Sequence, residues 1–384
     1  MKKYNVIAGL NIGKIILGNA LMYNAEIFSR NGIILGISML ILLGGIFAHL
    51  SLFILLKSGY MKNKRKYEDL IVSTLGNKMK YFIKIFVLFL CAFSICTYVD
   101  IVRIILRQMG LTNQIDLYVT LAIFIFINFI FVKYEYLAFV NILGLIGVVV
   151  FACISFAKSL NYGNVKNIVL AKGNIDTVDS ISRISLSFCY HYCVLPFLDG
   201  INLKGPGVER NIAISVGVAG IVGTVTHIFI GTTGYIAFPK SKPLWFENIT
   251  DSDPVVFYVL LITMLAITVL SVPICFIGIK LEYEPFLTKQ TDCIKSRLVG
   301  SVLTCLLVLG GQILANNTFI KCLVAIITSL IMFIFPGLSF LKIADRKDLR
   351  TRKISLFCVV FGIILLLKTG FDLCYNLVLL VINA

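Results

Sequence analysis

A succession of apolar segments, most of them about as long as a lipid bilayer is thick, constrains this chain more than any other feature. The segments cover approximately residues 5–29, 33–56, 81–107, 117–132, 136–157, 182–203, 211–236, 255–279, 298–315, 319–341 and 355–382. About 20 apolar residues in a helix cross the roughly 30 Å hydrocarbon core. Because backbone groups in lipid must pair within the protein, each segment is predicted to be a helix.

Composition argues against a soluble fold. The 384 residues are 59% hydrophobic and 14% charged, whereas soluble proteins carry about 25% charged residues. A globular domain of this size has too little interior to hide so much apolar surface. We therefore predict an all-α polytopic membrane protein with about eleven spans, in which residues 1–384 form a single transmembrane domain.

The net charge of +16 has an explanation in membrane topology. Most lysines and arginines lie in short connecting loops, including residues 62–66 and 346–353, as the positive-inside rule requires of cytosolic loops. A nucleic-acid-binding face is not expected. This pattern predicts a cytosolic N-terminus, and it places the sequons at Asn248 and Asn316 outside, as in a glycoprotein. The sequence leaves open whether the membrane is the plasma membrane or that of a vacuole or lysosome.

Two apolar segments carry helix-interrupting and polar residues near their centres. The first contains Gly18 beside Asn19, and the sixth contains His191 before Pro196. Interrupted helices at corresponding places in two halves indicate a binding site between the halves, near the bilayer midplane. We therefore expect an inverted 5+5 repeat, with halves at roughly 5–157 and 182–341 and an extra helix at 355–382.

Several stretches resemble, in the same order, motifs of the amino acid/auxin permease family. They are residues 14–22 (KIILGNALM), 66–76 (KYEDLIVSTLG), 188–200 (FCYHYCVLPFLDG), 234–238 (GYIAF) and 271–273 (SVP). The family includes sodium-coupled neutral amino acid transporters and vacuolar amino acid transporters. The resemblance implies a leucine-transporter-like fold, alternating access and a zwitterionic amino acid as substrate.

The chain departs from the family pattern at the first motif. Lys14 stands where the sodium-coupled members have an asparagine that binds sodium, and Ala20 and Ala25 replace a small residue and a proline. We therefore expect secondary active or facilitative transport that is not sodium-coupled, leaving symport with protons, exchange and uniport open. An amino acid sensor with a transporter fold is the alternative, and a channel is a more distant one.

The interrupted first helix supplies the candidate substrate-binding residues Gly18, Asn19, Ala20 and Leu21. A half-helix end presents unpaired amides that suit a carboxylate. The alternative is that Gly18 only lets two helices approach closely.

Lys14, Thr268 and Ser271 are the candidate ion-coupling residues. A lysine in mid-membrane marks a pathway or a pair, and the Lys14 ammonium could replace a sodium ion beside the two hydroxyls. Alternatively, Lys14 reaches water at the cytosolic face, and the hydroxyls bond to carbonyls of their own helix.

The sixth helix supplies Tyr190, His191 and Cys193 as further substrate-binding candidates. His191 either responds to protons or substrate or bonds a carbonyl freed by the break. His49 and His227 are expected to pack or to lie at the membrane interface.

Spacing within the third and last segments places opposite charges on one helix face. Asp100 with Arg103 and Lys368 with Asp372 are predicted structural pairs, and Asp100 is also a candidate gating residue.

Nothing in the sequence points to an enzyme or a metal site. The chain lacks the usual catalytic motifs and C-x-x-C pairs, and its three histidines lie in separate segments. Most cysteines fall in apolar segments, where they act as small hydrophobes. We expect no cofactor apart from a possible coupling proton. The expected partners are the amino acid substrate and membrane lipid, and the protein is expected to be a monomer.

Overall fold

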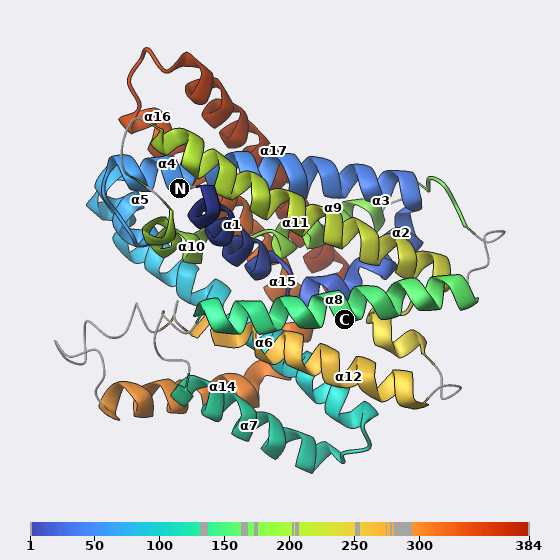
Figure 1. The fold of residues 1–384 in the computed structure, drawn as a ribbon. Helices are drawn as coiled ribbons and strands as arrows, with labels where there is room; N and C mark the ends of the chain where they lie inside the picture. The colour runs from blue at the N-terminus through green and yellow to red at the C-terminus, as the bar shows by residue number, and fades with distance from the viewer. Residues whose placement is uncertain are drawn as a thin grey trace.

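The computed structural model describes residues 2–130, 137–162, 168–172, 176–201, 203, 207–249, 254–273, 275–276, 279 and 294–382. Within these ranges the regular structure is helical, and the predicted apolar segments fall on helices. Figure 1 shows several long helices side by side, as expected where lipid forces every backbone group to pair within the chain.

The first two apolar segments are not single straight helices. The first divides into α1 (Lys2–Ile16), the 3-10 helix η1 (Asn19–Tyr23) and α2 (Asn24–Asn31). The second consists of α3 (Ile33–Met39), the π-helical η2 (Leu40–Ala48) and α4 (His49–Met61). π-Helical turns are uncommon and often mark functional sites.

The following segments form longer helices around these. They are α5 (Tyr67–Leu75), η3 (Asn77–Met79), α6 (Lys80–Gln108), α7 (Asn113–Ile130) and α8 (Leu137–Tyr162). The sixth segment is again interrupted, with α9 (Asp176–Ser187), α10 (His191–Val194) and the 3-10 helix η6 (Leu195–Gly200).

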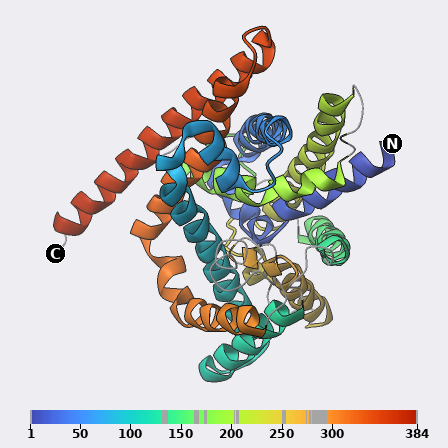
Figure 2. The same cartoon turned by 90° about the vertical axis from the view of Figure 1, so that its left-hand side faces the viewer.

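The C-terminal half continues with α11 (Val208–Ala237), the 3-10 helix η7 (Trp245–Asn248), α12 (Pro254–Val269) and α14 (Ile294–Asn316). The tenth segment contains α15 (Thr318–Ser329), the π-helical η8 (Leu330–Ile334) and α16 (Phe335–Ile343). The last helix, α17 (Leu349–Ile382), runs along the outside, and its C-terminal end points away from the other helices (Figure 2).

Six described helical stretches are long and apolar enough to cross a membrane: Ile33–Met61, Asn77–Gln108, Phe139–Asn161, Val208–Ala237, Phe319–Ile343 and Leu349–Tyr375. Their outer faces carry large exposed apolar side chains such as Tyr81, Leu367 and Phe371. Exposed apolar surface on this scale is typical of a protein that lipid surrounds.

The broken first helix lies inside the bundle. α1 packs along α11, which also contacts α2, η2, α4 and α8, while α8 packs against α12. Neighbours on several sides remove the break in the first helix from lipid. This packing allows irregular backbone at membrane depth.

The first segment ends at a glycine whose backbone has a positive φ angle. Gly32 has φ +81°, a conformation that side chains disfavour, and a Cβ there would lie 2.9 Å from the Ala171 backbone. The amides of Ile33 and Ile34 donate to the Val169 and Leu170 carbonyls at 3.2 and 2.8 Å. Residues 168–172 are thereby held across the junction of α2 and α3.

Candidate functional site

The predicted interruption of the first helix is confirmed. α1 ends at Ile16, and Gly18 has φ −105° and ψ −144°, which is not helical. The Asn19 backbone begins η1, Ala20 is half-buried and Leu21 is buried. The first amides of a helical segment have no acceptor within the helix, so this turn presents N–H groups inside the protein.

Three carbonyl groups at the end of α1 have partners outside the helical ladder. The Gly18 carbonyl accepts from the Leu21 amide at 3.2 Å. The Leu17 carbonyl accepts from Lys14 Nζ at 3.3 Å, and the Ile16 carbonyl lies 3.4 Å from His227 Nε2. Two of the three partners are therefore side chains that are rare inside membranes.

Lys14 does not reach water. Its side chain is fully buried, and Nζ donates to Ser271 Oγ at 3.0 Å as well as to the Leu17 carbonyl. The snorkelling interpretation of Lys14 is therefore wrong. An ammonium group fixed between a backbone carbonyl and a hydroxyl has the surroundings that suit a small cation.

The two candidate hydroxyls of the eighth segment have different hydrogen-bond partners. Ser271 lies just after α12 and combines both predicted roles, since its Oγ accepts from Lys14 and donates to the Ile267 carbonyl at 2.7 Å. Thr268 donates to the Met264 carbonyl at 2.8 Å. A role for Thr268 beside Lys14 stays a prediction.

Sequence reasoning missed two residues beside Lys14 and Gly18. A Cβ at Gly144 of α8 would overlap the Lys14 side chain and lie 3.0 Å from Nζ, so the absence of a side chain there makes room for the lysine. A Cβ at Gly18 would lie 3.5 Å from the Tyr98 hydroxyl and 3.6 Å from Ser271 Oγ, both ordinary contacts. A glycine that receives a lysine side chain has no signature in a single sequence.

The sixth helix is also interrupted, about two helical turns before its proline. α9 ends at Ser187, α10 begins at His191, and Pro196 lies at the start of η6, where proline is tolerated. Tyr190 precedes α10 and is buried, and its hydroxyl hydrogen-bonds with His49 Nε2 at 3.1 Å. The break therefore falls at residues 188–190, which include neither glycine nor proline.

The other candidates of the sixth helix lie directly at this break. The Cys193 thiol donates to the Tyr190 carbonyl at 3.2 Å. His191 is fully buried, with its ring centroid 5.5 Å from that of Tyr190. No described side chain hydrogen-bonds to either ring nitrogen of His191, which lies beside the Ala48 backbone.

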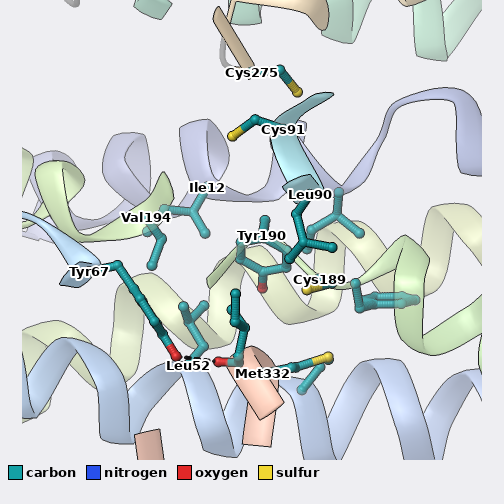
Figure 3. Close-up of a cluster of buried hydrophobic side chains, with 14 of the residues drawn as sticks. Ile12, Leu52, Tyr67, Leu90, Cys91, Cys189, Tyr190, Val194, Cys275 and Met332 are labelled. Carbon is teal, nitrogen blue, oxygen red and sulfur yellow. Dashed lines mark hydrogen bonds between the residues drawn. The ribbon is translucent and has the colours of Figure 1, made fainter. Parts of the chain in front are cut away.

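Apolar, thiol and phenol side chains surround the two breaks. Cys91 of α6 and Cys275 belong to the same buried cluster as Tyr190 and Val194, which Figure 3 shows with the two sulfur atoms on one side. Cys275 also lies close to Tyr98 and Tyr192. The neighbourhood of the sixth break is thus largely uncharged.

One of the two predicted charge pairs is confirmed, and the other stays a prediction. Lys368 and Asp372 form an ion pair at 2.6 Å, as expected, while the pairing of Asp100 with Arg103 stays a prediction. Arg103 also contacts the buried carboxylate of Asp116 on α7 at 3.3 Å. That contact joins two helices, so spacing within one helix could not reveal it.

A model of the family described as transmembrane amino acid transporter protein matches residues 6–371. The chain belongs to this family. The transporter has no significant match among curated proteins.

A solved structure resembles the transporter over nearly its whole length. The crystal structure of MhsT in complex with L-phenylalanine matches with a TM-score of 0.60 at 12% sequence identity, covering 94% of this chain and 98% of MhsT. At this identity the likeness shows a common fold. Together with the apolar helices, the family establishes an integral membrane protein.

Proposed function

We propose that this protein carries an amino acid across a membrane by alternating access, with the substrate bound between the breaks of the first and sixth helices. The proposed architecture is the inverted 5+5 repeat, with eleven spans, a cytosolic N-terminus and residues 355–382 outside the repeats, in a monomer. Support comes from the family and from two broken helices that both lie inside the bundle.

The substrate carboxylate is proposed to bind the amides at Gly18, Asn19 and Ala20, at the positive end of a helical segment, with Leu21 lining the same site. The substrate ammonium is proposed to bind at the sixth break, at residues 188–190, where the chain is again not helical. Tyr190, His191 and Cys193 line that break. The largely uncharged surroundings favour a zwitterion over an amino acid with a charged side chain.

Transport is proposed to be independent of sodium, and the position of Lys14 carries this conclusion. Its buried ammonium lies between the Ser271 hydroxyl and the Leu17 carbonyl, beside the first break. A sodium ion in that place would meet a fixed positive charge within a few ångströms, and such repulsion is strong in a low-dielectric interior.

Gating is assigned to charges beside the two half-helices α2 and α9. Glu26 of α2 accepts a hydrogen bond from Arg183 of α9 at 2.9 Å, which ties the two half-helices together. Asp100 of α6 lies near Tyr23, the last residue of η1. Asp100 is proposed as a second gating charge at this end of the first helix.

The test is uptake of labelled amino acids into proteoliposomes, with sodium and pH gradients imposed separately. We expect saturable uptake and counterflow that persist when choline replaces sodium. An absolute sodium requirement would contradict the role of Lys14, and binding without flux would point to a sensor instead.

A matched pair of variants sharpens this test. Lys14→Ala should abolish or uncouple uptake, whereas Lys368→Ala, which removes a lysine from the outer helix α17, should leave uptake unchanged. Equal uptake by the Lys14→Ala variant and the wild-type protein, at equal amounts of folded protein, would remove the basis for the proposal.

A further inference from the structure

All three histidines of the chain are buried near the helix breaks. His49, His191 and His227 belong to three different apolar segments, yet each is at most 6% exposed. Buried imidazoles in a membrane protein need polar partners, because an unpaired ring nitrogen costs free energy in an apolar environment. The partners of two of these rings belong to the interrupted helices.

His227 of α11 contacts both sides of the first break. Asn24 Nδ2, at the start of α2, lies 2.9 Å from His227 Nδ1 and also donates to the His227 carbonyl at 3.3 Å. Nδ1 also lies 3.2 Å from Asn24 Oδ1. Because Nε2 faces a backbone carbonyl, which can only accept, the ring proton is on Nε2 and Nδ1 accepts from the Asn24 amide. Nε2 then donates to the carbonyl of Ile16, the last residue of α1. One ring thus joins the end of α1 to the beginning of α2.

His49 makes the corresponding contacts at the sixth break. Its Nδ1 lies 2.5 Å from the Gly44 carbonyl in the π-helical η2, so Nδ1 carries the proton. Its Nε2 is then free to accept from the Tyr190 hydroxyl at 3.1 Å. His49 therefore holds the residue that precedes α10.

Phe188 connects the two imidazoles. This residue of the sixth break is fully buried, and its ring centroid lies 5.0 Å from that of His227 and 6.1 Å from that of His49. A Cβ at Gly44 would overlap the Phe188 ring, so η2 and the ring are in close contact. Continuous packing from one break to the other transmits displacement, because tightly packed interiors deform little.

We infer that His227 is a positioning residue of the transport site, which fixes both sides of the first break and, through Phe188 and His49, sets the position of the sixth break relative to it. This inference rests on the proposed function, because the two breaks form the proposed substrate site. His227 itself is not assigned a contact with the substrate.

Three substitutions separate the two hydrogen bonds of the ring. In His227→Gln the side-chain amide can replace Nε2 and donate to the Ile16 carbonyl. In His227→Asn the shorter amide can replace Nδ1 but does not reach Ile16, and His227→Leu removes both bonds. Thr226→Val is the matched control, because the neighbouring Thr226 hydroxyl bonds the Val222 carbonyl of its own helix at 2.7 Å.

We expect His227→Asn and His227→Leu to raise the KM for uptake by about tenfold, as the loss of a hydrogen bond to a buried carbonyl would do, with much less effect on kcat. His227→Gln should stay near the wild-type KM, and Thr226→Val should match it. The inference is overturned if the Leu variant transports with unchanged KM, or if the Gln variant is no better than the Asn variant.

Hydrogen–deuterium exchange of residues 16–24 provides a readout that does not depend on transport. The backbone amides of this stretch should exchange faster in the Asn and Leu variants than in the wild-type protein and the Gln variant. Equal exchange in all of them would overturn the positioning role. Absence of amino acid uptake and binding by the wild-type protein, with the expected exchange pattern, would instead count against the proposed function alone.

Discussion

The contact between Lys14 and Gly144 permits a quantitative test of where the lysine lies. In the wild-type background, Gly144→Ala places a methyl group into the volume of the Lys14 side chain. Overpacking of this kind costs about 1–3 kcal/mol. Alanine in place of glycine inside a helix gains about 1 kcal/mol, so the net effect should be a loss of about 0–2 kcal/mol.

In a Lys14→Ala background the same substitution should have the opposite sign. The obstructing side chain is gone, so only the helix-propensity gain of about 1 kcal/mol remains. The coupling free energy between the two positions is then about 1–3 kcal/mol, well above the 0.3–0.5 kcal/mol within which independent sites add.

The assay is equilibrium unfolding of the four proteins of this double-mutant cycle in mixed detergent micelles, followed by circular dichroism. The Gly144→Ala protein should also show lower uptake, because the added methyl group is expected to displace Lys14 from Ser271 and so impair transport. Additive effects of the two substitutions on the free energy of unfolding would refute the placement of Lys14 against α8.

Three further predictions concern single residues. Tyr98→Phe removes the hydroxyl that faces Gly18, and we expect a higher KM for uptake without a loss of thermal stability; an unchanged KM would contradict this. Asp116→Ala leaves Arg103 and Arg107 without their shared buried carboxylate, which should cost about 3–5 kcal/mol; a loss below about 1 kcal/mol in unfolding experiments would be inconsistent with burial of the carboxylate. Partial burial raises the pKa of Asp348, but hydrogen bonds from Lys57 and Thr351 outweigh it and lower the pKa below its ordinary value. The stabilisation by ionised Asp348 is therefore present above the ordinary aspartate pKa of about 4 and fades as the pH falls further. Asp348→Asn should lower the melting temperature at neutral pH and make the melting temperature depend less on acid pH. Identical pH profiles of the variant and the wild-type protein would contradict this prediction.

Hydropathy predicted the positions of the helices, because the requirement for internal backbone pairing in lipid applies to every span. An apolar segment at membrane depth has no alternative to internal backbone pairing. The break at Gly18 was also predictable, since glycine and polar neighbours interrupt an otherwise apolar segment and match a family motif. The interruption of the sixth helix was expected from His191 and Pro196, but its position at residues 188–190 could not be read from the proline, because a proline at the first turn of a helical segment costs little.

The partners of the polar side chains could not be predicted in the same way. Ser271 is 257 residues from Lys14 along the chain, and Asn24 is 203 residues from His227. Such contacts depend on how α1 packs against α11 and the eighth segment, which residue type and spacing do not specify. His227 was expected only to pack or to lie at the membrane interface, because nothing near it in sequence reveals the Ile16 carbonyl that it meets.

The loop that contains Asn248 gives another example. The sequon at Asn248 extends to Thr250, which lies outside the described residues, but the Asn248 amide nitrogen already donates to the Trp245 carbonyl at 3.0 Å. Its oxygen accepts from the Lys242 amide at 2.8 Å. A sequon alone does not reveal that its asparagine is engaged in the folded protein.

A cryo-electron-microscopy map of the wild-type protein in sodium-containing buffer, with the best-transported amino acid bound, tests the central claim most directly. The account predicts density for the substrate between residues 18–21 and 188–190, with the Lys14 ammonium still on Ser271. Substrate density elsewhere, or a cation bound to Ser271 and the Leu17 carbonyl with Lys14 displaced, would contradict it.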